Sequence, residues 1–221
     1  RAGVKLMVNC YPLWQPNNVE LFRRAKNGEI GEIYEVTTTR GMKGPKQCLG
    51  VLTPQYIEWL YDPVQHGGGV LYDQAGYGIL YSLMLLGRPA TVYARIMPVV
   101  KHPEGWVDDS CYLILGYPRA TAVISASWAW PHPRGEIMCF GSRGSLITRF
   151  GEPPTWESHL VWRNAPETVT DGKDWKKDMV SKTIPAAEIP PERKHGIAHF
   201  AHCLRNDLEI DTAHSAATSL M

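Results

Sequence analysis

Three polar side chains stand at four-residue spacing in an otherwise apolar segment of the chain. Residues 65–89 read QHGGGVLYDQAGYGILYSLMLLGRP and carry Asp73, Tyr77 and Tyr81. Positions i, i+4 and i+8 of an α-helix lie on one face, so these side chains would form a single row. A carboxylate can accept a proton from a hydroxyl group, and a phenol can donate or relay one. The row is therefore a candidate surface for binding a ligand.

Glycines surround this row. Residues 67–69 are three glycines in succession, and Gly76 and Gly78 expose backbone beside the row. Glycines before a helix allow a sharp turn or let backbone N–H groups face a ligand. The alternative is a core helix in which Asp73 satisfies first-turn N–H groups and the tyrosines reach water with their hydroxyl ends. The pattern alone leaves both interpretations open.

The elements that must position the row follow from hydrophobic periodicity. Residues 5–10 and 32–41 indicate strands, residues 19–27 and 55–61 indicate helices, and the row itself lies on a long apolar helix. Strands then follow one another, with helices predicted at the end of the chain. These are strands 90–100, 110–117, 120–130, the hairpin 135–151 and a further strand near 158–163, then helices 193–208 and 212–220. Consecutive strands with short turns pair antiparallel. The sequence therefore predicts an α+β domain, with a large, mainly antiparallel open sheet and helices on one face.

Three segments resemble, in the same order, signatures of the Gfo/Idh/MocA oxidoreductases. They are GEIGEIYEV, HGGGVLYDQAGYGI and GSRGSLI. Members of this family are NAD(P)-dependent enzymes that act mostly on sugars, polyols and related compounds. They have an N-terminal Rossmann domain and a C-terminal α/β domain whose open sheet often packs against another subunit. The resemblance implies that Asp73 and Tyr77 are catalytic, because they stand where the family has an Asp and a His that face substrate and nicotinamide.

Two departures from the family pattern shape the expectation. Tyr77 replaces the usual His, and a phenol is a poorer base than imidazole at neutral pH. The chain also has no G-x-G-x-x-G and no E-K-P segment. We therefore expect residues 1–12 to be a remnant of the last strand of a dinucleotide-binding domain, and residues 13–221 to be the C-terminal domain. NAD or NADP would bind the complete enzyme, and this chain is not expected to hold it tightly.

Further candidates for contact with substrate precede the row. Tyr11 and Trp14 follow the first strand, at a position between domains where ligand pockets are common, although simple packing is the plainer interpretation. Arg40 ends the strand 32–41 and could hold a hydroxyl or a carboxylate, whereas an exposed arginine is the usual alternative. Tyr81 completes the polar row.

Two tryptophans share one face of the strand 120–130. Trp128 and Trp130 could stack on the apolar side of a sugar ring. Burial at a sheet or subunit interface is the competing interpretation, since aromatic residues are enriched there. Trp59, before Asp62, is expected only to pack.

The last predicted helix carries three histidines within a narrow arc. His195, His199 and His202 would lie opposite Ile197 and Leu204, which are expected to face the core. Histidines at i and i+4 can bind zinc. A solvated face is the expectation here, because no cysteine or carboxylate lies nearby on the same stripe. No metal is therefore predicted.

Composition excludes several classes of partner. The 221 residues carry a net charge of +1 with no basic run, so neither nucleic acid nor an anionic membrane is an expected partner. No apolar run reaches the length of about 18 residues needed to span a bilayer. Five cysteines in no C-x-x-C pattern indicate free thiols and a cytoplasmic protein.

The function expected from this sequence is that of the substrate-binding and oligomerisation part of an NAD(P)-dependent oxidoreductase. The substrate would be a small carbohydrate-like molecule, and the open sheet face would form a homodimer or homotetramer. Two alternatives stay open: a binding or assembly module without a cofactor, and a relative that uses NAD for glycoside cleavage or elimination.

Overall fold

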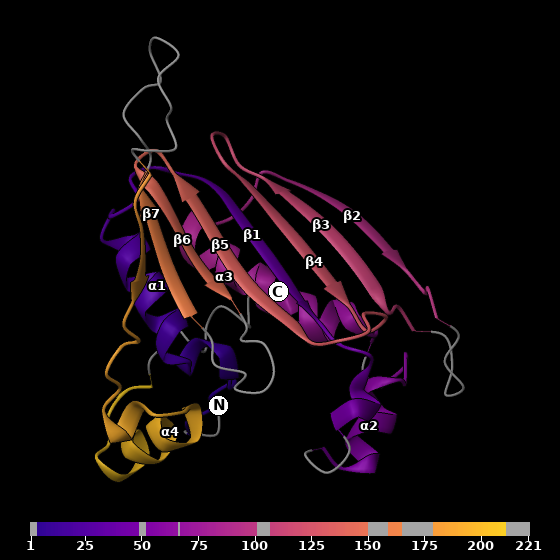
Figure 1. Cartoon of the computed structure of the whole chain (residues 1–221). Coiled ribbons are helices and arrows are strands. Elements are labelled where there is room, and N and C mark those ends of the chain that lie inside the picture. The colour runs from indigo at the N-terminus through magenta and orange to yellow at the C-terminus, as the bar shows by residue number, and fades with distance from the viewer. Residues whose placement is uncertain are drawn as a thin grey trace.

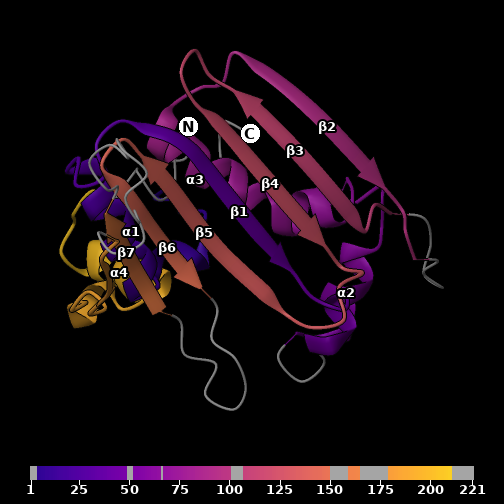
Figure 2. The same cartoon turned by 45° about the horizontal axis from the view of Figure 1, so that its top comes forward.

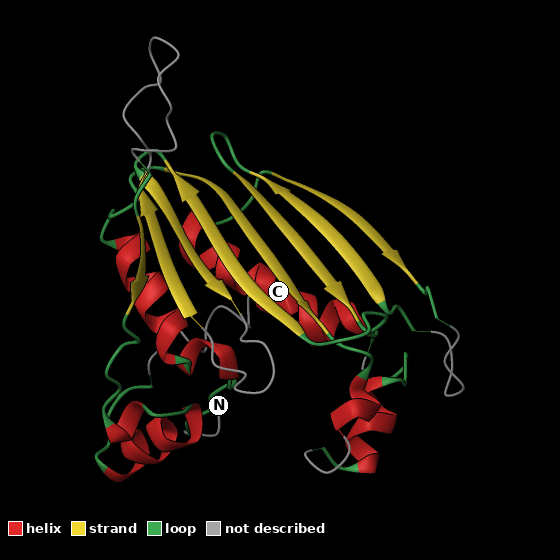
Figure 3. Cartoon of the chain, in the orientation of Figure 1, coloured by secondary structure: helices red, strands yellow, loops and turns green. Residues whose placement is uncertain are grey.

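The computed structural model describes residues 4–48, 52–65, 67–100, 107–149, 159–164 and 179–210. In this part of the chain, all long strands belong to one sheet, and the helices lie on one side of it (Figures 1 and 3). The sheet has eight strands in the order β2-β3-β4-β1-β5-β6-β7-β8. The predicted α+β class, with an open and mainly antiparallel sheet, is confirmed.

The strands match the predicted segments closely. Their bounds are β1 (Ile33–Gly41), β2 (Thr91–Met97), β3 (Ser110–Gly116), β4 (Thr121–Ser127), β5 (Arg134–Gly141), β6 (Gly144–Arg149), β7 (His159–Asn164) and β8 (Ser181–Ile184). Alternating or β-branched apolar residues in β3 to β6 place one row of each strand against the helices. Strand β8 was not predicted, because it is four residues long and mostly polar.

Strand β1 occupies the centre of the sheet, which differs from the predicted order. Consecutive strands β4 and β5 do not pair with each other, since β1 lies between them, parallel to β4 and antiparallel to β5. Thr38 is opposite Ile124 on one side and Ile137 on the other. Residues 128–133 are long enough to cross the width of one strand, which leaves room for β1. A strand buried on both edges satisfies all its backbone groups in this position.

The helical layer covers the middle of the sheet. It consists of α1 (Pro16–Lys26), the π-helical turn η3 (Leu71–Ala75) and α3 (Gly76–Leu86), and both longer helices lie under the strands in Figures 1 and 2. Gly78 brings α3 into direct contact with the sheet. A Cβ at Gly78 would lie 2.4 Å from Thr38 Oγ1 and 2.7 Å from a methyl group of Ile124. This glycine therefore serves helix–sheet packing.

The first described residues form no strand. Residues 4–10 belong to no helix or strand, so the predicted strand 5–10 is wrong for this structure. A strand needs hydrogen-bonded neighbours, and no described segment pairs with these residues. Val4 and Leu6 are 78% and 80% exposed.

The remaining helices lie at the ends of the layer. They are η1 (Tyr11–Trp14), η2 (Pro45–Cys48), α2 (Pro54–Leu60), η5 (Pro191–Arg193) and α4 (Gly196–Arg205). The orientation predicted for α4 is wrong: Ile197 and Leu204 face solvent, whereas His199 and Cys203 are buried. His199 turns inward because it packs on the indole of Trp14, with ring centroids 5.2 Å apart. The predicted helix 212–220 lies outside the described residues.

None of the helices in the described ranges combines the length and apolar character that a bilayer crossing requires.

Candidate functional site

Asp73 is held by two neighbours and lines a cavity. Its Oδ2 accepts hydrogen bonds from Trp128 Nε1 at 3.0 Å and from Gln74 Nε2 at 2.5 Å. Trp128 is itself buried and packs on Tyr61, with ring centroids 5.2 Å apart. In the described part of the chain, Oδ1 receives no hydrogen bond. The hydrogen bonds to Oδ2 therefore fix the orientation of the carboxylate, and Oδ1 remains able to accept a hydrogen bond.

The three glycines before η3 lie next to Asp108, a carboxylate of the same chain. Asp108 accepts hydrogen bonds from the backbone N–H groups of Gly69 at 2.8 Å and Leu71 at 2.7 Å, and its carbonyl accepts one from Val70 at 2.9 Å. A Cβ at Gly69 would lie 2.0 Å from the Asp108 carbonyl oxygen. The glycine run therefore allows the backbone to approach Asp108, which fixes the start of the helix that carries Asp73.

Replacing Asp108 by Ala is expected to destabilise the chain by about 2 to 3 kcal/mol, because two helix-start N–H groups lose a charged acceptor. Urea unfolding followed by far-UV circular dichroism measures this loss. Glu58→Ala is the matched control, since Glu58 is exposed on α2, and it should change stability by less than about 0.5 kcal/mol. Equal stability of the two variants would show that Asp108 does not anchor the helix.

Tyr77 lies one helical turn from Asp73, and the guanidinium of Arg40 stacks on its ring. The Cζ atom of Arg40 lies 4.5 Å from the centroid of the Tyr77 ring. Burial raises the pKa of Tyr77, while the positive charge of Arg40 opposes that rise. The phenol is therefore protonated at neutral pH and acts there as a hydrogen-bond donor.

Two cavities lie beside α3. Tyr77 lines one of them, and Arg40, which stacks on Tyr77, lines the other. The first, of about 220 Å³, is lined by Asp73 and Tyr77 together with Cys10 and the aromatic residues Tyr56, Trp59 and Tyr72. We call it the Asp73 cavity. The second, of about 250 Å³, lies between the helices and the sheet. Its walls include Arg40, Tyr81, Tyr11, Thr38, Asn18 and Gln74, and we call it the Arg40 cavity.

The predicted row is split between these cavities. Asp73 and Tyr77 line the first, while Tyr81 lines the second and packs on Phe22, with ring centroids 5.5 Å apart. Burial raises the pKa of Tyr81 above its ordinary value. The π-helical turn η3 precedes this helix, and such turns are frequent at functional sites.

The other predicted residues fall in different places. Tyr11 and Arg40 line the Arg40 cavity. Trp14 is buried and donates from Nε1 to Asn9 Oδ1 at 3.1 Å, away from both cavities. Trp128 supports Asp73, and Trp130 lies beyond the end of β4 beneath the Arg134 guanidinium, 5.6 Å from its Cζ. Neither tryptophan lines the Asp73 cavity or the Arg40 cavity.

Several cavity residues were not expected to take part in a site. Trp59 was expected only to pack, yet it lines the Asp73 cavity with Tyr56 and Tyr72. Their cluster of aromatic residues beside the glycine run is the signal in the sequence. Gln74 and Thr38 line the Arg40 cavity, and nothing in their spacing distinguishes them from ordinary buried polar residues.

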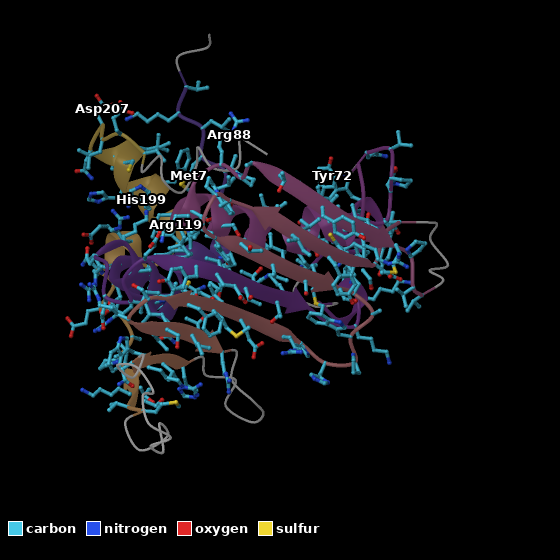
Figure 4. The ribbon with its side chains drawn as sticks, turned by 90° about the horizontal axis from the view of Figure 1, so that it is seen from above. Met7, Tyr72, Arg88, Arg119, His199 and Asp207 are labelled. Carbon is cyan, nitrogen blue, oxygen red and sulfur yellow. The ribbon has the colours of Figure 1, made fainter. Side chains whose placement is uncertain are left out.

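The histidines in and next to α4 lie in different environments. His195 caps the helix by accepting from the Ala198 N–H at 3.1 Å, so it lies outside the helix proper. His199 lies at the opposite end of the molecule from Tyr72 of the Asp73 cavity (Figure 4). The predicted solvated histidine face is therefore wrong for His199, which is buried. In the described ranges, no group of three or more His, Cys, Asp or Glu residues could hold a metal ion.

Comparison with protein families gave one match. The model described as the GFO/IDH/MocA C-terminal domain matches residues 19–147, which include β1, η3, α3 and β2 to β5. A comparison with curated proteins gave no match.

Solved structures share this fold at low sequence identity. A Desulfitobacterium hafniense protein, proposed to be an NADPH-dependent oxidoreductase, is 17% identical with a TM-score of 0.71, and the match covers 98% of this chain and 59% of that one. Aldose-aldose oxidoreductase from Caulobacter crescentus, complexed with glycerol, is 20% identical with a TM-score of 0.67, covering 95% and 56%. Levoglucosan dehydrogenase, complexed with NADH and L-sorbose, is 16% identical with a TM-score of 0.65, covering 92% and 58%. The chain thus spans somewhat more than half the length of these proteins.

Proposed function

Because the chain belongs to the GFO/IDH/MocA family, whose C-terminal domain it carries, we propose that it forms the substrate-binding and oligomerisation part of an oxidoreductase. The complete protein would transfer hydride between NAD(P) and a sugar, polyol or related alcohol. The observation that carries this proposal is the Asp73 carboxylate, held by Trp128 and Gln74 with one oxygen free beside Tyr77.

The chain's own residues would bind the reacting alcohol and control its proton. The free Oδ1 of Asp73 accepts a hydrogen bond from the hydroxyl group and orients its carbon. The protonated Tyr77 donates a hydrogen bond to a second substrate oxygen, and Arg40 holds the Tyr77 ring in place. Tyr56, Trp59 and Tyr72 offer apolar surface to a sugar ring. NAD(P), when bound in the complete protein, would accept the hydride from the substrate or donate it.

The dinucleotide itself does not fit the described residues. Neither cavity exceeds about 250 Å³. No described strand leads through a glycine-rich turn into a helix, the arrangement that holds a pyrophosphate. We propose that residues 1–12 end the dinucleotide-binding domain and that residues 13–221 form the substrate domain. The alternating exposure of Val4 and Leu6, which could pack on that domain, supports this division.

The 221-residue chain by itself is expected to bind NAD(P) more weakly than about 1 mM and to lack dehydrogenase activity, because it has no phosphate-binding turn. Isothermal titration with NAD⁺ and NADP⁺ measures this affinity. Micromolar binding by this chain would contradict the proposed division into domains.

The function is tested on the full-length protein. It is incubated with NAD⁺ or NADP⁺ and a panel of sugars and polyols, and reduced cofactor is followed by its absorbance. Accumulation of NAD(P)H supports the oxidoreductase. Glycoside cleavage without accumulation of NAD(P)H would point instead to transient use of the cofactor, and failure to use any cofactor would favour a binding module.

Two further features of the complete protein belong to this proposal. We propose that the sheet face opposite the helices joins two or four copies of the chain, because that face carries exposed apolar side chains. The cysteines whose side chains the structure describes, Cys10, Cys111, Cys139 and Cys203, are free thiols, which supports a location in the reducing cytoplasm.

A further inference from the structure

Arg40 has a charge that no described acidic residue balances. Its guanidinium stacks on Tyr77, 4.5 Å from the ring centroid, and its Nε is buried with no hydrogen-bond partner in the described chain. None of the ion pairs found in this part of the structure includes Arg40. A partly buried cation without an anionic partner is unfavourable, and an anion entering the cavity would relieve that cost.

A second polar group in the same cavity also lacks a partner. Thr38 Oγ1 is buried, with the residue 3% exposed, and receives or donates no hydrogen bond in the described chain. Thr38 and Arg40 stand two residues apart on β1, so their side chains point to the same face of the sheet, toward α3. A bound anion with several acceptor lone pairs could accept hydrogen bonds both from the Arg40 guanidinium, whose Nε has no partner, and from the Thr38 hydroxyl on the same face of β1.

The charges and size of the cavity limit the kind of anion. Two other charged residues, Glu136 and Arg149, border the cavity, but they pair with each other in the row of Thr39, on the opposite face of the sheet from Thr38 and Arg40. The lining therefore has a surplus of one positive charge, which matches a monoanion. A volume of about 250 Å³ lies at the small end of ligand pockets and suits a single sugar-sized molecule.

We infer that Arg40 selects a sugar or polyol that carries a carboxylate, such as a uronic or aldonic acid. This inference rests on the proposed function, because it takes the acid to be the substrate of the oxidoreductase and places its carboxylate at the Arg40 guanidinium, which stacks on Tyr77 of the Asp73 cavity. The guanidinium donates two parallel hydrogen bonds to the carboxylate, and Thr38 Oγ1 donates a third. Tyr77 remains stacked on the guanidinium.

Direct binding to the chain tests the inference without hydride transfer. Isothermal titration compares three acids with their neutral counterparts: D-glucuronate with D-glucose, D-galacturonate with D-galactose, and D-gluconate with D-glucitol. At least one acid should bind tenfold or more tightly than its counterpart. Glucose 6-phosphate provides a dianionic probe, and it should bind less tightly than the preferred acid. Equal affinities in all three pairs, or preference for the phosphate, would overturn the assignment of a carboxylate.

Variants locate the charge that makes the difference. Arg40→Gln should lower the affinity for the preferred acid at least tenfold and lower the affinity for its neutral counterpart by a much smaller factor. Arg95→Gln is the matched control, because Arg95 is exposed on β2 and lies on the face of the sheet opposite to that of Arg40. This variant should bind the acid as tightly as the unaltered chain does. Thr38→Val keeps the shape of the side chain and should weaken acid binding severalfold, which gives a second reading if Arg40→Gln fails to fold. Acid preference that survives both variants would overturn the inference.

The two proposals fail separately. If the full-length protein oxidises neutral polyols and the chain shows no acid preference, the proposed oxidoreductase activity is supported and the proposed acid selectivity is wrong. If no substrate supports hydride transfer but acid binding depends on Arg40, the proposed acid-binding site is supported and the proposed oxidoreductase activity is wrong.

Discussion

Asp73→Asn in the full-length protein is expected to lower kcat/KM by about 10²- to 10⁴-fold, the range of a general acid–base contribution. The asparagine oxygen can still accept from Trp128, so the side chain keeps its position. Its amide group, however, then stands where the free carboxylate oxygen had been. The charge and the proton acceptor are lost together, whereas the hydrogen bonds that support the fold remain.

Tyr77→Phe should lower kcat/KM by a smaller factor, about tenfold or more, because it removes one hydrogen-bond donor and keeps the ring under Arg40. Steady-state kinetics with the true substrate measures both variants, and thermal unfolding measures their stability. Free energies of unfolding should change by less than about 1.5 kcal/mol, the size of one ordinary hydrogen bond.

Tyr34→Phe is the control for these kinetics, since Tyr34 is 47% exposed on β1 and lines neither cavity. It should retain full activity. If Asp73→Asn and Tyr77→Phe both kept the kcat and kcat/KM of the unaltered enzyme, neither residue would belong to the reacting site. A loss of stability with unchanged kinetics would instead identify a helix whose polar residues only support the core.

Ile114→Asp should convert a dimer of the chain into a monomer, with an affinity between subunits at least 100-fold weaker. Ile114 is 45% exposed and pairs with Tyr93 and Val123 on the sheet face that no described helix covers. Other exposed apolar residues on this face are Tyr112 on β3 and Phe140 on β5. A broad apolar face is rarely left in water, and a charge placed on it would be buried without a partner in the assembly.

Sedimentation velocity at low micromolar concentration tests this assembly. The unaltered chain should sediment at twice or four times its 24.8 kDa mass, through an interface on the order of 2,000 Å² or more. Val92→Asp is the matched control, since Val92 is exposed on edge strand β2 but faces the other side of the sheet, and it should leave the assembly intact. An unaltered chain that sediments as a monomer would contradict the proposed interface.

Local pattern predicted most elements, because alternation and helical periodicity report burial directly. Strands β3 to β6 and helix α3 lie where apolar residues recur at the expected spacing. Position in the sheet could not be predicted in the same way. The place of β1 between β4 and β5 depends on pairing with strands far away in the chain, and no local property of Thr38 or Val36 specifies those partners.

The sequence predicted some of the residues that line the two cavities, such as Asp73 and Arg40, but not how they are arranged. Asp73 and Tyr77 do line one cavity, as their spacing indicates. The hydrogen bond from Trp128 to Asp73 requires the end of β4 to meet η3, which only the folded chain reveals. Likewise, the wheel of α4 placed Ile197 inward, because it could not include the indole of Trp14, against which His199 packs.

The central place of β1 also has a consequence for how the chain acquires its fold. During synthesis β1 leaves the ribosome well before either of its neighbours, since its partners Ile124 and Ile137 belong to the second half of the sequence. The β2–β3–β4 and β5–β6–β7 groups can each form from adjacent hairpins, but their union waits for β1 to enter between them. Sheets closed by such distant pairings fold slowly, because the loop-closure entropy is lost before the new contacts form. Until that step, both edges of β1 and the inner edges of β4 and β5 remain open to pairing with other chains, which makes this intermediate the stage most exposed to aggregation.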